Sequence, residues 1–282
     1  MDQEAALQAA ARAIAQATAL VITAGAGMGV DSGLPDFRGN QGFWNAYPPY
    51  RHLGLSFIDM ANPRWFVQDP ALAWGFYGHR LMLYRATVPH SGFALLRQWA
   101  ETMRDGFRVF TSNVDGQFQK AGFDESCIEE CHGSIHHLQC TSDCGIGIFD
   151  AAPFDVDVDQ QTFRARDPLP ACPRCGALAR PNVLMFGDWQ WDASRSALQE
   201  QAFSRWAAHA LTRPDGRLVV VECGAGLAIP TVRRFGESLV ARHHGTLVRI
   251  NMREPAVPEG HVGLAMGAGD ALGEIDRRLR AT

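Results

Sequence analysis

Short apolar segments that alternate with helical patterns constrain the fold of this chain more than any other feature of its sequence. Four of them are rich in Val, Ile or Phe and are followed by Gly, Asn or Asp: residues 19–23, 107–113, 217–224 and 245–252. Strands that alternate with helices predict a parallel sheet covered on both faces. We therefore expect an α/β, Rossmann-like fold that binds a ligand at the carboxyl ends of its strands.

A cysteine-rich segment at 127–180 interrupts this alternation and holds six of the seven cysteines. Its pairs Cys140-x3-Cys144 and Cys172-x2-Cys175 have the spacing of two zinc knuckles. Four thiolates around a tetrahedral ion leave no position for water, so the pattern predicts a structural rather than a catalytic zinc. The alternative is that the four cysteines are unrelated. We expect this segment to be a small module inserted between strands.

A glycine turn, Gly25-Ala26-Gly27, follows the first strand. Glycine lets backbone N–H groups come close to a pyrophosphate at the start of a helix. The third glycine of the dinucleotide fingerprint is missing, because Val30 takes its place, and a tight strand-to-helix turn would also explain the pattern. Asp36-Phe37-Arg38 favours phosphate binding, since an arginine adds a charge-assisted hydrogen bond.

Polar side chains follow the second strand. Asn113 and Asp115 lie on one side of the chain by the period of a strand, where they could bind a carboxamide. A helix N-cap or an Asx-turn is the structural alternative. His132 lies ahead of the first zinc cysteine and could act as a general base near neutral pH. A purely structural histidine is the alternative here, and His136 and His137 compete as bases or as metal ligands.

Taken in order, these motifs resemble those of the sirtuins, which are NAD-dependent protein lysine deacylases. The stretch GAGMGVDSGLPDFRG is similar to the family's GAGxSxxSGIPDFRG, TSNVD to its TQNID, and CHG to its catalytic HG. ARPNVLMFGD, GAGLAIP and RIN resemble further elements of the family, and the four cysteines match its zinc module in order. The match is collinear over nearly the whole chain, so the ordered set is far more specific than any single motif.

The resemblance implies one catalytic unit with two domains. A large NAD-binding domain would comprise about 1–40, 88–126 and 181–282. A small domain would combine a helical insert at about 41–87 with the zinc module at about 127–180. NAD would be a co-substrate, one zinc ion would be structural, and the acylated lysine of a protein substrate would lie between the domains.

The resemblance also assigns roles to residues of this chain. His132, as general base, and Asn113 are the implied catalytic residues. A substrate peptide is expected to pair as an added strand with Val183, Leu184, Met185, Phe186 and Gly187. The residues implied to line the NAD site are Ala24, Gly25, Ala26, Gly27, Asp36, Phe37, Arg38, Ser112, Asn113, Val114, Asp115, His132, Gly224, Ala225, Gly226 and Asn251.

The implied reaction begins when the acyl oxygen attacks C1′ of the nicotinamide ribose as nicotinamide leaves. His132 then draws a proton through the ribose hydroxyls, and the products are lysine, nicotinamide and 2′-O-acyl-ADP-ribose. Two alternatives stay open: ADP-ribosyl transfer or NAD hydrolysis, and a weakly catalytic sensor of NAD or acyl-lysine. The sensor stays open because Met28, Ser112 and Ala225-Gly226 depart from polar family residues expected beside the cofactor.

Tyr77 and Arg80 bear on the identity of the acyl group. They lie three residues apart on an expected helix and therefore share one face. Sirtuins that remove succinyl or malonyl groups carry a similar Tyr-x-x-Arg, in which both side chains hold the distal carboxylate. The alternative is an arginine that extends to the surface beside a buried tyrosine.

Composition narrows the possible partners and locations. A net charge of -4 argues against a nucleic-acid partner bound through phosphate contacts. The apolar runs are shorter than the roughly 18 residues of a membrane span, and the N-terminus lacks the layout of a secretion signal. Close cysteine pairs fit metal binding in a reducing compartment. We therefore expect a cytoplasmic protein without a membrane partner; no pattern indicates its oligomeric state.

Overall fold

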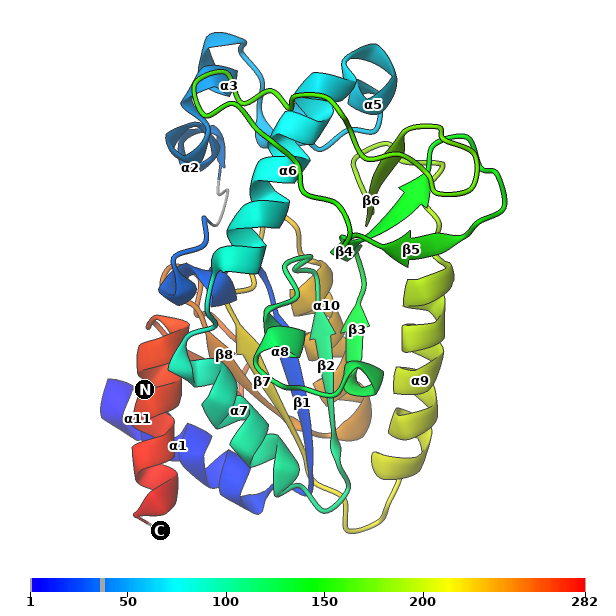
Figure 1. Cartoon of the computed structure of the whole chain (residues 1–282). Coiled ribbons are helices and arrows are strands. Elements are labelled where there is room, and N and C mark those ends of the chain that lie inside the picture. The colour runs from blue at the N-terminus through cyan, green and yellow to red at the C-terminus, as the bar shows by residue number, and fades with distance from the viewer. Residues whose placement is uncertain (1, 36–38, 282) are drawn as a thin grey trace.

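Six parallel strands form the main sheet of the computed structural model, which describes residues 2–35 and 39–281 (Figure 1). Their order is β3-β2-β1-β7-β8-β9, and the expected parallel α/β sheet is confirmed. The edge strands β3 and β9 are three residues long, too short to give a pattern in the sequence. The strands are β1 (Ala19–Ala24), β2 (Phe107–Thr111), β3 (Ile128–Glu130), β7 (Leu218–Cys223), β8 (Thr246–Ile250) and β9 (Val262–Leu264).

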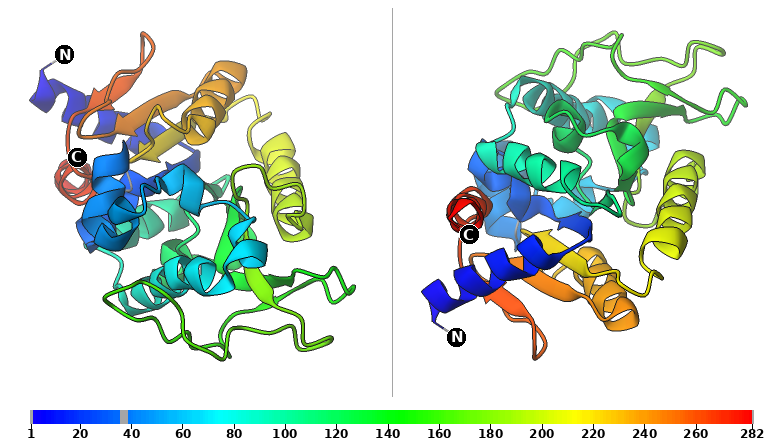
Figure 2. Two further views of the ribbon diagram at one scale, coloured as in Figure 1. Left: turned by 90° about the horizontal axis from the view of Figure 1, so that it is seen from above. Right: turned by 90° about the horizontal axis from the view of Figure 1, so that it is seen from below.

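Helices cover both faces of this sheet. On one face α1 (Gln3–Gln16), α7 (Ser91–Glu101) and α11 (Ala268–Arg280) share a core with Leu20 and Ile22. On the other, α9 (Ser194–Ala210) and α10 (Thr231–His243) share a core with Val21, as the alternation of side chains in a strand requires. Helices α1 and α11 lie side by side (Figure 2). Within the described residues, none of the helices combines the length and the apolar character needed to cross a membrane.

A smaller unit lies beyond the carboxyl ends of the parallel strands (Figure 1). Its antiparallel sheet has the order β5-β4-β6, and its helices pack on that sheet through one cluster rich in aromatic residues. The strands are β4 (Gly133–Cys140), β5 (Ile148–Asp150) and β6 (Ala179–Val183). The helices are α2 (Gly39–Ala46), α3 (Pro48–His52), α4 (Phe57–Met60), α5 (Trp65–Gln68) and α6 (Pro70–Ala86).

The two-domain division expected from the sequence stays a prediction, and two strands pair differently from what its boundaries imply. Strand β3 falls within 127–180 but pairs with β2 in the parallel sheet. Strand β6 extends past residue 180 but pairs with β4 in the antiparallel sheet. The chain therefore passes from one sheet to the other between β3 and β4, at His132.

Candidate active site and zinc centre

The turns that follow β1 and β7 pack against each other backbone to backbone. Gly27 donates its N–H to the carbonyl oxygen of Gly224, with an N–O distance of 3.0 Å. A Cβ atom on Gly25 would lie 2.8 Å from the Cα of Ala225. Gly224 has a φ of +66°, and its Cβ would lie 2.2 Å from the nitrogen of Met28. Close packing alone therefore requires Gly25 and Gly224, and phosphate binding at this turn stays a prediction.

The rest of the first motif is only partly accessible to a ligand. Ala24 ends β1 and is buried, and the short 3₁₀ helix η1 (Ala26–Ser32) follows. The side chain of Met28 is fully buried in the core of the parallel sheet, so it does not line a ligand site in this structure. The predicted phosphate-binding residues Asp36-Phe37-Arg38 lie outside the described residues.

Hydrogen bonds join the end of β2 to the end of β1. The N–H of Ser112 donates to the carbonyl of Ala24, with an N–O distance of 3.2 Å. The side-chain Nδ2 of Asn113 donates to the carbonyl of Gly25 at 3.1 Å. The predicted NAD residues of these two strand ends are therefore adjacent, and the half-buried Asn113 connects them.

Asp115 is buried and makes an Asx-turn, which is the structural alternative to carboxamide binding that the sequence left open. Its Oδ1 accepts a hydrogen bond of 3.0 Å from the N–H of Gln117, the first residue of α8 (Gln117–Lys120). Burial raises the pKa of Asp115 to about 6, although the bond from Gln117 acts in the opposite direction. Val114 is buried in the aromatic cluster of the smaller unit. Binding of a carboxamide by Asn113 and Asp115 stays a prediction.

His132 lies in the connection from β3 to β4, and this connection runs beside the Asn-x-Asp segment. Two backbone hydrogen bonds fix this position, one from a residue before His132 and one from a residue after it. Cys131 donates to the carbonyl of Thr111, and Ile135 donates to the carbonyl of Val114, both with an N–O distance of 3.0 Å. The structure thus brings the predicted base next to the end of β2.

The imidazole of His132 has the properties that a general base needs. It is half-buried, and no hydrogen bond joins it to another described residue. Burial lowers its pKa from the ordinary value, so the ring is neutral and able to accept a proton near neutral pH. The competing histidine His136 places its Nε2 3.0 Å from the carbonyl oxygen of Asp115, which it helps to hold in position.

The predicted peptide-binding edge begins directly beside His132. Val183, the last residue of β6, pairs with Gly133, and the N–H of Leu184 donates to the carbonyl of His132 at 3.0 Å. A Cβ on Gly133 would lie 2.1 Å from the carbonyl oxygen of Asn182, so this close pairing requires the glycine after His132. Beyond Val183 the segment Leu184–Gly187 leaves the strand and enters a turn. Pairing with a peptide stays a prediction.

Asn251 follows β8, and its side chain forms hydrogen bonds to the turn after β7 and to the residues after β8. Its Nδ2 donates to the carbonyl of Ala225 at 2.7 Å, and its Oδ1 accepts from the N–H groups of Arg253 and Glu254 at 3.0 Å. Ala225 is buried and Gly226 is half-exposed. Asn251 therefore fixes the turn after β7, and its predicted contact with a ribose stays untested.

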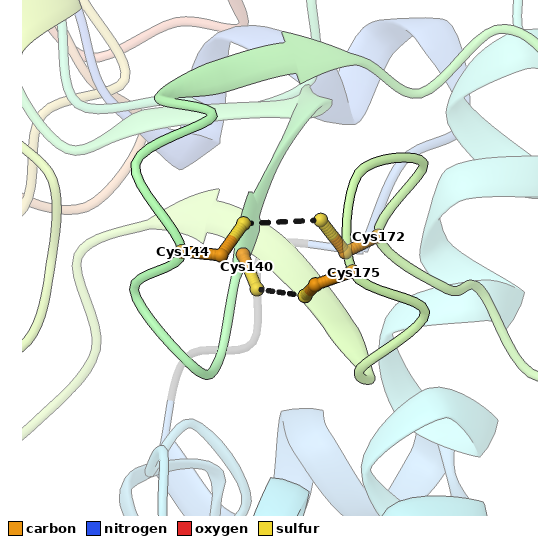
Figure 3. Close-up of side chains that lie close together, drawn as sticks. All are labelled: Cys140, Cys144, Cys172 and Cys175. Atoms are coloured by element: carbon orange, nitrogen blue, oxygen red, sulfur yellow. Dashed lines mark hydrogen bonds between the residues drawn. The ribbon is translucent and has the colours of Figure 1, made fainter.

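The four predicted zinc ligands converge between two loops (Figure 3). The Sγ–Sγ distance is 3.6 Å for Cys140 and Cys175 and also 3.6 Å for Cys144 and Cys172. A tetrahedral zinc with Zn–S bonds of ~2.3 Å separates its sulfurs by about 3.8 Å, so the cluster fits the ion. Within the described part of the chain, it is the one group of three or more His, Cys, Asp or Glu side chains placed to hold a metal. Histidine ligands to zinc are therefore not supported.

Tyr77 and Arg80 lie on α6 and are 1% and 6% exposed. The guanidinium carbon of Arg80 is 5.7 Å from the ring centroid of Tyr77, and its Nε donates to the hydroxyl of Tyr84 at 3.0 Å. The buried hydroxyl of Tyr77 has no hydrogen-bond partner among the described residues. Arg80 does not extend to the surface, so the alternative of a solvent-exposed arginine is wrong.

No sequence pattern predicted the buried polar network formed by residues of β6 and of the turn that follows it. Arg180 and Asp188 form an ion pair, with an Nη1–Oδ1 distance of 3.2 Å, and both side chains are almost fully buried. Asn182 is fully buried and donates to the carbonyl of Asp192 at 2.8 Å. These residues lie in and after ARPNV, which is too polar to suggest a buried strand, and only the contacts reveal their role.

The parallel sheet carries glycine turns and polar side chains at its carboxyl edge, and it is joined to a four-thiolate module. These features define an α/β protein of the dinucleotide-binding class with structural zinc. The sequence model of the Sir2 family matches residues 25–205. The chain belongs to the Sir2 family.

Relatives match this chain over nearly its full length. NAD-dependent protein deacylase 1 of Pseudomonas aeruginosa is 31% identical and aligns over 96% of this chain and 98% of its own length. NAD-dependent protein deacylase 2 of Pyrobaculum aerophilum is 31% identical, with 92% of each chain aligned. NAD-dependent protein deacylase 1 of Archaeoglobus fulgidus is 29% identical, with 95% of this chain and 96% of its own length aligned.

Solved structures support the same assignment. A Sir2 homologue in complex with ADP-ribose superimposes with a TM-score of 0.69 at 27% identity, covering 100% of this chain and 97% of the other. A Sir2 homologue in complex with NAD gives a TM-score of 0.68 at 26% identity, covering 100% of this chain and 94% of the other. The similarity thus includes both the parallel sheet and the zinc module.

Proposed function

We propose that this protein is an NAD-dependent protein lysine deacylase, which transfers the acyl group of a modified lysine to ADP-ribose and releases nicotinamide. Membership of the Sir2 family supports this function, and the three relatives named above carry the deacylase name. The observation that carries the proposal is the position of His132. The bonds from Cys131 to Thr111 and from Ile135 to Val114 hold it at the end of β2, next to the first residues of the predicted peptide-binding edge.

The chain's own residues suit each part of this reaction. NAD, when bound, supplies the glycosidic carbon that accepts the acyl oxygen. His132 accepts a proton, because its ring is neutral and engaged by no described residue. Asn113 lies beside it at the end of β2, close to the glycine turn. A peptide that paired with Val183 and Leu184 would lie directly beside the base, because these residues contact Gly133 and His132.

Nicotinamide release, measured without peptide and with acetyl-, succinyl- and malonyl-lysine peptides, tests the proposal against its rivals. A deacylase releases nicotinamide only with the acylated peptide and forms one 2′-O-acyl-ADP-ribose for each nicotinamide. Release that does not depend on the peptide would instead support NAD hydrolysis or ADP-ribosyl transfer. Binding of NAD and acyl-peptide without release would support a sensor.

The pH profile should report on the base. The neutral imidazole is the active form, and its pKa is lowered in the fold, so kcat/KM should stay high as the pH falls to about 6.5 and decline only below it. An acidic limb centred at or above pH ~6.5 would contradict this assignment. Asp115, with a pKa of about 6, could add a second limb. The limb that survives in Asp115→Asn belongs to His132.

We propose further that the acyl group carries a carboxylate, as succinyl and malonyl groups do. Arg80 offers a positive charge in a buried setting, and the hydroxyl of Tyr77 is buried without a hydrogen-bond partner among the described residues. A buried donor left unsatisfied costs about 1–3 kcal/mol, and a ligand carboxylate would satisfy it. Tyr77 belongs to the cluster that also holds Val114 and Val183, which flank the proposed site, and the guanidinium of Arg80 lies over the Tyr77 ring.

Arg80→Met should lower kcat/KM for succinyl- and malonyl-lysine peptides by about 10–100-fold, because a charged hydrogen bond is lost in a dry site. Activity on acetyl-lysine should change by less than about 3-fold, since no charge faces the arginine there. Arg80→Lys keeps the charge without the planar guanidinium, so its kcat/KM for succinyl- and malonyl-lysine peptides should lie between those of the wild type and of Arg80→Met. Equal losses on all three peptides would contradict a role in selecting the acyl group, and a lowered melting temperature beside them would assign Tyr77 and Arg80 to the structural core.

A cytoplasmic location is part of the proposal. All seven cysteines are free thiols, and the four that fit a zinc ion must stay reduced to bind it. The proposed partner is a protein that carries an acylated lysine. A net charge of -4 gives no support for a nucleic-acid partner.

A further inference from the structure

A pocket with a volume of about 420 Å³ lies beside the zinc cluster. Its walls are the zinc loop at 140–147, the loop at 189–192 and residues of the segment 63–67. Two apolar side chains in this lining are unusually exposed: Trp189 is 96% and Val67 is 83% accessible. The reaction proposed above uses none of these residues.

The loop that carries Trp189 is held firmly on both sides of it. Before it, Asp188 forms the buried ion pair with Arg180. After it, Gln139 donates its Nε2 to the carbonyl of Gln190 at 2.7 Å. The backbone is thus fixed while the indole stays in solvent. A large aromatic side chain on a rigid, exposed support is typical of a binding contact, because little conformational entropy is lost when it is covered.

The charges of the pocket favour a cationic occupant. Asp143 is exposed in its lining, and no hydrogen bond or ion pair joins its carboxylate to another described residue. Asp192 also lines the pocket and uses one carboxylate oxygen to accept from the N–H of Ser194 at 2.9 Å. The one cation in the lining, Arg180, is neutralised by Asp188. Four thiolates outweigh the charge of a bound zinc ion, so the wall that they share adds negative potential.

The pocket also continues the edge proposed to bind the peptide. Along β6, Arg180 in the pocket is followed by Val183 beside His132, a step of about 10 Å in a strand. We propose that the pocket binds a lysine or arginine side chain of the substrate protein, roughly three to five residues from the acyl-lysine. The aromatic face of Trp189 and the carboxylate of Asp143 would hold the cation. This inference rests on the deacylase function and adds a rule for selecting its substrates.

A matched set of acylated peptides tests the inference. Each peptide carries one arginine, or alanine in its place, at a position three, four or five residues before or after the acyl-lysine. Arginine at one or more of these positions should lower KM and the Kd for the peptide by about 3- to 10-fold, with kcat unchanged. Raising the ionic strength should reduce this advantage, because it is electrostatic.

Two variants and two controls locate the effect. Trp189→Ala and Asp143→Asn should each reduce the arginine advantage to less than about 2-fold. Leu198→Ala and Glu259→Gln remove an exposed apolar and an exposed acidic side chain that do not line the pocket, and both variants should retain the arginine advantage. An advantage that is absent, or that survives both pocket variants, overturns the inference while peptide deacylation upholds the proposed function. If no acylated peptide is processed, the proposed function fails and the inference with it.

Discussion

His132→Ala should lower kcat/KM for deacylation by about 10²–10⁴-fold, the usual contribution of a positioned general base. The fold should survive, because no hydrogen bond joins the ring to another described residue. What fixes this position is the backbone, through the bond from Leu184 to the carbonyl of His132 and the bond from Cys131 to Thr111. The melting temperature should therefore change by only a few degrees.

His137→Ala is the matched control, since His137 is a second half-buried histidine a few residues further along the same segment. It should retain most of the activity. Circular dichroism and thermal melting of both variants separate loss of the base from loss of the fold. Turnover by His132→Ala at the wild-type rate would exclude His132 as the base and would return the choice to His136.

Removing the zinc should have the largest effect on stability. Cys172→Ser, or treatment with a strong chelator, should abolish binding of one zinc ion per chain, as measured by native mass spectrometry. Structural zinc in small domains contributes about 10–16 kcal/mol of apparent binding energy. Even a loss of about 5 kcal/mol would lower the melting temperature by about 10–20 °C in a chain of this size.

The short elements of the smaller unit are the reason why we expect its stability to depend on the ion. Strand β5 has only three residues. Few backbone hydrogen bonds close the loop that carries Cys172, among them one of 2.7 Å from the N–H of Cys172 to the carbonyl of Ala177. Cys127→Ser provides the control, because Cys127 lies outside the four-cysteine group. It should keep the zinc and the melting temperature. A zinc-free Cys172→Ser protein with wild-type stability would show that the module holds together without metal.

The sequence revealed those parts of the fold whose physical cause is local. Strands β1 and β7 are buried on both faces, so they have nearly continuous apolar sequences, which only Glu222 in β7 interrupts with a charge. The zinc ligands were equally clear, because a knuckle fixes the spacing of its two cysteines along the chain. The order of the motifs then placed the strand ends, with their polar side chains, at one edge of the sheet.

Features that depend on partners distant in the sequence could not be predicted from the local sequence pattern. Strand β6 is fully buried although it contains Arg180 and Asn182, whose partners Asp188 and Asp192 lie beyond its end. The burial of Arg80 was also open, because an arginine at that spacing fits a helix surface as well as a core. In both cases a tertiary contact decides what the local pattern leaves undetermined.

The contact between the turns after β1 and β7 has a consequence for how this family can vary. A side chain at Gly25 would collide with Ala225, and one at Gly224 would collide with Met28. Neither turn can accept a bulkier residue unless the other retreats, although most of the chain separates them. The atoms in the way are backbone atoms, which no substitution on the opposite turn removes, so Gly25 and Gly224 have to be retained together for the two turns to keep this contact.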